Sequence, residues 1–136
     1  MTVITTATED GFAGFTVNSF TSVSMNPPLV LFCAGNDSET AAEIEQSKSF
    51  AVNILSRGQE EVSRRFCDSD CDRFSGVEVA SAATGAPILR EALAYVDCEL
   101  DDAVTAGDHR ILVGRVRSAG RLCDEEPLAF FKGAYR

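Results

Sequence analysis

Polar side chains without charge are concentrated in the stretch GFTVNSFTSVSMNPPL, which runs from Gly14 to Leu29. Between Thr16 and Ser24 this stretch holds five hydroxyl side chains and one Asn, and no charged residue. Hydroxyls donate and accept hydrogen bonds, so they suit a polar ligand that brings hydrogen-bonding groups of its own. Residues of these types also cap turns ahead of a Pro-Pro pair. The residues alone favour ligand binding and turn formation about equally.

The chain has a single histidine, His109, which follows Gly107 and Asp108. No Ser-His-Asp set and no pair of catalytic carboxylates accompanies it. The five cysteines include no C-x-x-C, and Cys67 and Cys71 are their only close pair. A zinc site needs more ligands than this pair and one distant histidine supply. We therefore expect no metal site, and free thiols in a reducing compartment.

The 12 basic and 21 acidic side chains give a formal net charge of −9. Non-specific nucleic-acid binding needs Lys and Arg to neutralise phosphates, so the charge argues against that function. The longest apolar run, Leu29 to Ala34, is far too short to span a membrane, and the first residues do not resemble a secretory signal. We expect a soluble, cytoplasmic protein that binds neither nucleic acid nor membrane.

Short apolar or alternating runs indicate a mainly β protein with two short helices. One helix is expected from an N-cap at Ser38 to about Ser47, and another over Gln59 to Phe66. Strands are expected at Val3–Thr6, Phe15–Asn18, Leu29–Ala34, Phe50–Leu55, Ala94–Leu100, Arg110–Ala119 and in the closing segment from Leu128. This order favours a closed or nearly closed antiparallel barrel over a parallel α/β sheet.

Four segments occur in an order and spacing that are similar to those of a known family: TVNSFTSVSMNPPLVLFC, SFAVNIL, the Gly107-Asp108-His109 segment and PLAFFKGAYR. Together they resemble the flavin reductases with the FMN-binding split-barrel fold, across essentially the whole chain. The resemblance implies a single domain, residues 1–136, with an antiparallel split β-barrel and a few short helices. The N-terminal segment that commonly precedes the first strand in this family is not evident here.

The resemblance also implies which residues hold the flavin. The end of the second strand would meet the isoalloxazine imide and the ribityl chain, the Cys33–Gly35 exit would pass under the ring, and the helix start at Ser38 would face the phosphate. The complete implied set is Thr16, Val17, Asn18, Ser19, Ser22, Ser24, Cys33, Ala34, Gly35, Ser38, Thr40, Lys48, Ser49, Phe50, Asn53 and Tyr135. Plain N-capping by Ser38 and structural hydrogen bonds of Asn53 are the alternatives that the residues leave open.

His109 would position the nicotinamide of NAD(P)H, because hydride transfer between the two cofactors needs no protein base. The resemblance thus implies an NAD(P)H-dependent flavin reductase that uses FMN or FAD. It would act as a homodimer and supply reduced flavin to a partner monooxygenase. Two alternatives remain: an FMN-binding electron carrier without efficient NAD(P)H oxidation, and a structural module that has lost the cofactor.

Overall fold

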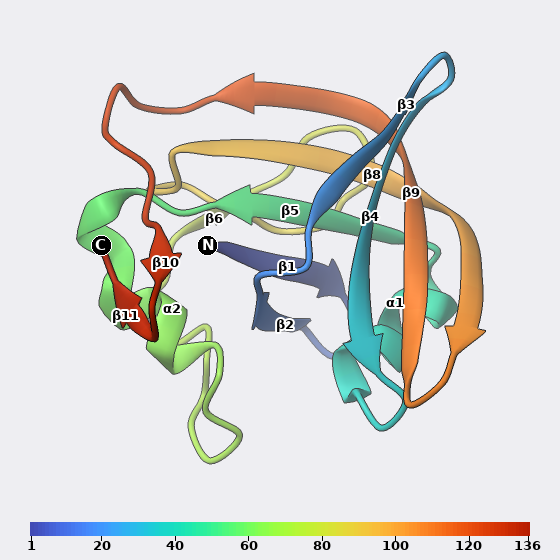
Figure 1. The fold of residues 1–136 in the computed structure, drawn as a ribbon, viewed down its shortest axis with the longest axis horizontal. Coiled ribbons are helices and arrows are strands. Elements are labelled where there is room, and N and C mark those ends of the chain that lie inside the picture. The colour runs from blue at the N-terminus through green and yellow to red at the C-terminus, as the bar shows by residue number, and fades with distance from the viewer.

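The computed structural model describes all residues 1–136, and β-strands dominate it (Figure 1). Two helices, α1 (Glu39–Ser47) and α2 (Glu60–Arg65), lie among the strands, with a 3₁₀ turn at Arg57–Gln59 ahead of α2. The strands are β1 (Thr2–Ala7), β2 (Phe12–Val17), β3 (Thr21–Met25), β4 (Pro28–Gly35), β5 (Ser49–Ile54), β6 (Val79–Ala80), β7 (Ile88–Leu89), β8 (Ala94–Ala106), β9 (His109–Arg121), β10 (Phe130–Phe131) and β11 (Ala134–Tyr135). Neither helix combines the length and the apolar surface that a bilayer crossing requires.

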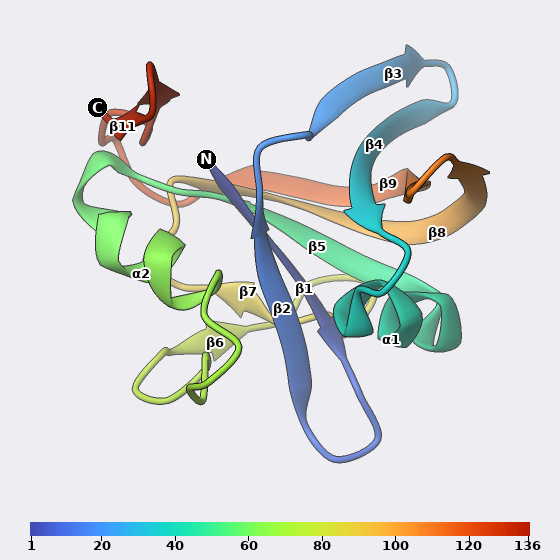
Figure 2. The ribbon, with the colours of Figure 1, turned by 60° about the horizontal axis from the view of Figure 1, so that its bottom comes forward.

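Seven strands form one antiparallel sheet in the order β2-β1-β5-β8-β9-β4-β3. The sheet curls strongly, so that the Phe15 ring on β2 lies 6.0 Å from the Phe32 ring on β4 (Figure 2). Its two edges, β2 and β3, follow each other in the chain but are not hydrogen-bonded neighbours. The prediction of an antiparallel sheet is confirmed, the parallel alternative is wrong, and the closed form of the barrel is not present.

The strands β1 and β5 are buried on both faces, because each separates two hydrophobic clusters. On one face Phe32, Phe50 and Leu112 pack inside the curl, where Ile44 of α1 covers them. On the other face Phe66 packs with apolar residues of the segments that surround α2. Burial on both faces explains why neither strand alternates between apolar and charged residues, and why the polar residues on them, such as Thr5 and Asn53, are buried with hydrogen-bond partners inside the protein.

The structure differs from the expected elements mainly at β3 and at the β8–β9 hairpin. β3 was expected to be loop, but it is an edge strand whose apolar side chains Val23 and Met25 are exposed. The expected strand at Ala94–Leu100 continues to Ala106 with exposed polar residues, and bulges shift its register to β9. The residues of β3 and of the β8 extension are mostly exposed, so they show no hydrophobic periodicity from which these strands could be predicted.

The core packs closely against Gly114 of β9, since an added Cβ would lie 2.4 Å from the Phe50 ring and 2.8 Å from the Cys98 Cβ. Both neighbours are fully buried and cannot yield. We expect Gly114→Ala to lower the free energy of unfolding by about 2 kcal/mol, measured by urea denaturation. The matched control is Gly58→Ala, where an added Cβ meets nothing within 4 Å. Equal effects of the two substitutions would contradict the packing role of Gly114.

Candidate functional site

The end of β4 and the start of β9 lie side by side, far apart in the sequence. Gly35 pairs with His109 in the antiparallel register, and the β8–β9 turn continues the contact beyond the sheet. The Asn36 backbone N–H donates to the Asp108 carbonyl at 3.0 Å, and the Asn36 side-chain amide donates to the Gly107 carbonyl at 3.0 Å. These bonds fix the turn that carries the only histidine against the exit of β4.

The helix α1 begins directly after this contact. Ser38 is its N-cap, and the Ser38 hydroxyl accepts a hydrogen bond from the Ala41 N–H at 3.2 Å. The Ser38 N–H in turn donates to the Gly35 carbonyl at 3.0 Å, which ties the helix start to the strand end. The predicted N-cap is therefore confirmed. The positive end of the helix dipole faces the same region as Gly35.

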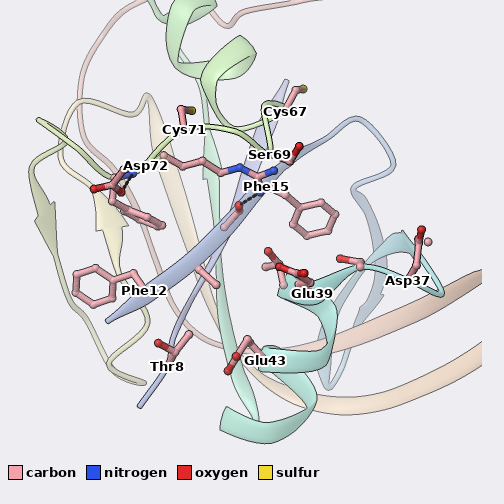
Figure 3. A pocket seen from close by; sticks show the side chains of 17 residues that line it. Thr8, Phe12, Phe15, Asp37, Glu39, Glu43, Cys67, Ser69, Cys71 and Asp72 are labelled. Carbon is pink, nitrogen blue, oxygen red and sulfur yellow. Dashed lines mark hydrogen bonds between the residues drawn. The ribbon is translucent and has the colours of Figure 1, made fainter. Parts of the chain in front are cut away.

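A cavity of about 970 Å³ opens beside the helix start (Figure 3). Strand β2, the start of α1 and the loop from Cys67 to Phe74 form its walls. Of the residues predicted to bind flavin, the cavity includes Gly35, Ser38 and Thr40. Its volume is at the upper end of the range that is usual for small-molecule sites.

Arg73 is a cavity residue that the sequence did not reveal. Its Nε donates to the Asp68 carbonyl at 2.7 Å and its Nη1 donates to the Gly14 carbonyl at 2.6 Å. None of the ion pairs of the chain includes Arg73. Carbonyl dipoles orient the guanidinium without neutralising its charge, so Arg73 retains both charge and N–H groups for an anion.

Carboxylates also line the cavity: Asp37, Glu39, Glu43 and Asp72. Figure 3 shows Glu39 and Glu43 on α1 and Asp37 just before it. Arg73 is the only basic residue among the lining residues. The cavity therefore combines one arginine that forms no direct ion pair with four carboxylates that can accept hydrogen bonds.

His109 is half exposed, and its Nδ1 lies 2.7 Å from the Asp108 Oδ1. The hydrogen bond from His109 lowers the pKa of the Asp108 carboxyl, and the charge of the ring adds to the effect. Asp108 thus stays ionised at neutral pH and holds the ring with Nε2 as the remaining polar atom. This arrangement leaves the Nε2 atom of a half-exposed ring free to contact a ligand.

The next residue of β9, Arg110, forms an ion pair with Glu45 of α1. Both side chains are largely buried between the helix and the sheet, and the Arg110 Nε has no hydrogen-bond partner. The pair links α1 to the strand that carries His109. The Arg110 guanidinium is therefore neutralised by Glu45 within the fold, and it is not a free cation at the β8–β9 turn.

The hydroxyl-rich segment makes two kinds of contact. The Thr16 hydroxyl donates to the Ser63 carbonyl of α2 at 2.6 Å, so it faces away from the cavity. The Ser19 hydroxyl accepts from the Cys33 N–H at 2.9 Å and donates to the Cys33 carbonyl at 3.1 Å. The Ser19 bonds bring the exposed Asn18 beside the end of β4. Hydrogen bonds within the protein thus explain the Thr16 and Ser19 hydroxyls, and Asn18 remains exposed.

Comparison with known proteins agrees with this arrangement. The model of the flavin reductase like domain matches residues 1–136. A reductase subunit of a flavin-dependent monooxygenase from Rhodococcus jostii is 40% identical over 135 residues, which are 99% of this chain and 69% of that protein. A flavin reductase from Pseudomonas putida is 40% identical over 133 residues, 97% of this chain and 78% of that protein.

This chain belongs to the flavin reductase family. Among solved structures, nitrilotriacetate monooxygenase component B from Mycobacterium thermoresistibile is 38% identical and superposes with a TM-score of 0.95, covering 99% of this chain and 76% of that one. The NADH:FAD oxidoreductase of Streptomyces globisporus, in complex with NAD and FAD fragments, is 36% identical with a TM-score of 0.91, and covers 99% of this chain and 82% of that one.

Several residues that the family resemblance assigned to the flavin lie away from the cavity in this flavin reductase. Lys48 caps the C-terminal end of α1 in a left-handed conformation, opposite to the end that Ser38 begins, and Ser49 follows it into β5. Phe50 is fully buried in the core. The Val17 side chain is also buried, and Ala34 packs in the same core cluster. Ser22 and Ser24 lie on the edge strand β3.

Asn53 and Tyr135 make their hydrogen bonds within the protein. The Asn53 amide, fully buried, donates to the Val3 carbonyl and the Thr5 hydroxyl and accepts from the Leu89 N–H, all within 3.0 Å. The Tyr135 hydroxyl lies 3.0 Å from the Ser63 hydroxyl, beside α2. Figures 1 and 2 both place β11 at the opposite side of the molecule from α1. A flavin contact by these two residues stays a prediction.

The cysteine thiols of this flavin reductase differ in how far they are exposed to solvent. Cys67 and Cys71 are exposed and line the cavity, whereas Cys98 is fully buried in the core. Burial, with a smaller contribution from the charge of Asp97, raises the pKa of the Cys98 thiol to about 12. Since the thiolate is the reactive form, only the exposed thiols should react readily in the native state.

We therefore expect a thiol reagent at mildly alkaline pH to label Cys67 and Cys71 within minutes and to leave Cys98 unlabelled. Mass spectrometry of the labelled peptides is the measurement. Labelling in denaturant provides the control, since all five cysteines should then react. Native labelling of Cys98 at the rate of Cys67 would show that the core is open.

Proposed function

We propose that this chain is an NAD(P)H-dependent flavin reductase that supplies reduced flavin to a partner monooxygenase. The observation that carries the proposal is Arg73, which forms no direct ion pair, in a cavity that includes the start of α1 and the end of β4. His109 lies directly across the sheet from that strand end. The names of the similar reductases support the assignment of the activity.

The residues present fit a flavin. Arg73 and the hydroxyls of Ser38 and Thr40 offer a cation and donors to its phosphate. Gly35, without a side chain, lets a flat ring approach the strand backbone. Asn18 and the edge serines of β3 are neutral donors and acceptors that suit the imide and the ribityl hydroxyls.

His109 positions the nicotinamide, and Asp108 holds the imidazole ring in place. When both cofactors are bound, they supply the redox chemistry, a hydride passing from nicotinamide C4 to flavin N5. The chain contributes alignment of the two rings and the electrostatic environment of the phosphates. No side chain has to accept or donate a proton in that step.

The finer features of the family are part of this proposal. The open, curled sheet forms a single split-barrel domain over residues 1–136. Two copies associate as a homodimer through the β3–β4 hairpin, on which Val23 and the 94% exposed Met25 present apolar surface to solvent. The dimer brings the edge serines and the C-terminal aromatic residues of two chains into reach of one flavin. The cytoplasmic location remains a prediction.

The test of the function is a titration of the purified chain with FMN and FAD, followed by measurement of NADH and NADPH oxidation from the absorbance of the reduced nicotinamide. We expect flavin binding and steady oxidation of at least one nucleotide. Flavin binding without oxidation of either nucleotide would favour the electron carrier. Absence of flavin binding would favour a structural module.

Substitution of Arg73 by Gln tests the phosphate contact. We expect the Kd for flavin to rise about 10- to 100-fold, because a charge-assisted hydrogen bond contributes about 1.5–3 kcal/mol. Calorimetric titration with FMN measures the change. Arg57→Gln is the matched control, since Arg57 is an exposed arginine paired with Glu126 outside the cavity. An unchanged Kd for FMN in the Arg73 variant would contradict the assignment of the flavin phosphate to this cavity.

Substitution of His109 by Ala tests the nicotinamide contact. We expect the KM for NADH to rise about tenfold, the loss of roughly 1.4 kcal/mol of binding, with a much smaller effect on the Kd for flavin. Steady-state kinetics at saturating flavin give the KM. The Asp108→Asn variant, which keeps the hydrogen bond and loses its charge, should have an intermediate KM. A rise in the flavin Kd with no change in KM would contradict this role.

A further inference from the structure

The two exposed cysteines of the chain lie on one short loop of the cavity wall. Cys67 and Cys71 both line the cavity, on the side that lies across from α1 (Figure 3), and every residue from 67 to 72 is exposed. Of the other thiols, that of Cys98 is fully buried and those of Cys33 and Cys123 are partly buried. An oxidant that enters from solvent therefore meets this pair first, and the loop can rearrange without disturbing the core.

The loop folds back on itself, so that the Cys71 thiol contacts the chain on both sides of Cys67. The Cys71 Sγ lies 3.7 Å from the Arg65 carbonyl oxygen and 4.0 Å from the Asp68 carbonyl oxygen. The Asp70 N–H donates to the Asp68 carboxylate at 2.8 Å and tightens the turn between the two cysteines. Cys67 and Cys71 are thus on facing arms of one turn, which is the arrangement that a disulfide needs.

The same loop holds the arginine of the cavity. The Arg73 Nε donates to the Asp68 carbonyl at 2.7 Å, and this is one of the two carbonyls that the Cys71 thiol contacts. A bond between the two sulfur atoms encloses Asp68 in a small ring of the chain and takes the Cys71 thiol away from its carbonyl. The Gly14 carbonyl is then the only acceptor that still holds the Arg73 guanidinium. The oxidation state of the thiols is therefore coupled to the position of Arg73.

A flavin reductase generates an oxidant of thiols when its product is not consumed. Reduced flavin passes two electrons and two protons to oxygen, which yields oxidised flavin and hydrogen peroxide. A thiolate attacks the peroxide, so that an S–O bond forms, the O–O bond breaks and water leaves, and the product is a sulfenic acid. A second thiol attacks this sulfur, so that the S–S bond forms, the S–O bond breaks and a second water leaves. Two thiols and one hydrogen peroxide thus give one disulfide and two waters.

We propose that Cys67 and Cys71 are a redox-active pair that hydrogen peroxide converts to a reversible disulfide, and that this disulfide weakens flavin binding by displacing Arg73. The effect on flavin rests on the proposed function, which places the flavin phosphate on Arg73, whereas the pairing of the thiols does not. An exposed disulfide across so short a loop is readily reduced by other thiols, so the change is reversible. A reductase whose reduced flavin is left to react with oxygen would in this way slow its own supply.

The first part of the experiment treats the reduced, purified chain with hydrogen peroxide, alkylates the remaining thiols and digests the chain with trypsin. Cleavage after Arg65 and Arg73 leaves both cysteines in the one peptide 66–73. Mass spectrometry should find this peptide without alkyl groups and lighter than its reduced form by two hydrogen atoms, and dithiothreitol should restore both alkylation sites. Addition of oxygen atoms to this peptide without a disulfide, or a disulfide between two chains, would overturn the proposal.

The second part measures the Kd for FMN by calorimetric titration before and after oxidation. We expect oxidation to raise the Kd about tenfold, a part of the effect of losing a charge-assisted hydrogen bond, and dithiothreitol to reverse it. Reversal also separates the disulfide from oxidation of the exposed Met25, because dithiothreitol does not reduce methionine sulfoxide. The Kd of the Cys71→Ser variant should not change with peroxide. The matched control, Cys123→Ser, alters a thiol outside the cavity and should respond as the wild type does.

The outcomes separate this proposal from the proposed function. A disulfide that leaves the Kd for FMN unchanged, or an equal response of Cys71→Ser and the wild type, would overturn the coupling to flavin binding and leave the reductase function intact. Failure of the reduced chain to bind flavin would overturn the proposed function and the coupling together. The mass of the peptide still decides in that case whether the two thiols form a pair.

Discussion

The antiparallel pairing of β4 with β9 is the constraint on which the candidate site depends. It runs from Leu29–Arg115 to Gly35–His109, so the last residue of one strand lies opposite the first of the other. The helix α1 starts just after Gly35, and the buried pair of Arg110 with Glu45 holds it to β9. A helix start and a hairpin turn from distant parts of the chain therefore keep a fixed relation without any ligand.

The charge of Arg73 persists for a geometric reason. Most arginines of this acidic chain pair with carboxylates on the surface, where an ion pair contributes little to stability. Arg73 is instead clamped between the carbonyls of Asp68 and Gly14, which hold its guanidinium in the cavity wall. An added Cβ at Gly14 would lie 2.9 Å from the Ile4 carbonyl and 3.0 Å from the Phe66 ring, so the chain passes here in close contact with its neighbours. The packing of the sheet thus sets the electrostatics of the site.

The sequence predicted the elements that are recognisable from local residue patterns, and it missed the features that depend on contacts between distant parts of the chain. Strands β1, β4 and β5 and the cap of α1 follow from apolar runs and from Ser38, and their positions agree within a few residues. Of the predicted closed or nearly closed barrel, the antiparallel sheet is present and full closure is not, because no local sequence pattern determines whether two edge strands pair. Arg73 went unnoticed because its role depends on a carbonyl 59 positions away. Gly35, Ser38 and His109, which the family resemblance assigned to the cofactors, lie near one another, but the resemblance assigned the flavin to Asn53 as well, whose hydrogen-bond partners are all within the fold.

One of the neutral hydroxyls, that of Ser19, satisfies the open edge of the sheet. β3 pairs with β4 only as far as Thr21–Leu31, so the outward N–H and carbonyl of Cys33 have no strand beside them. The Ser19 hydroxyl serves both groups, since one hydroxyl donates and accepts at once, which a carboxylate or an ammonium group cannot do. The Ser19 side chain thereby makes the two hydrogen bonds that a neighbouring strand would otherwise make with Cys33. No strand pairs with this side of β4 at Cys33, and Gly35, two residues further on, lines the cavity. The edge of the sheet next to the site is therefore satisfied by a side chain rather than by a further strand.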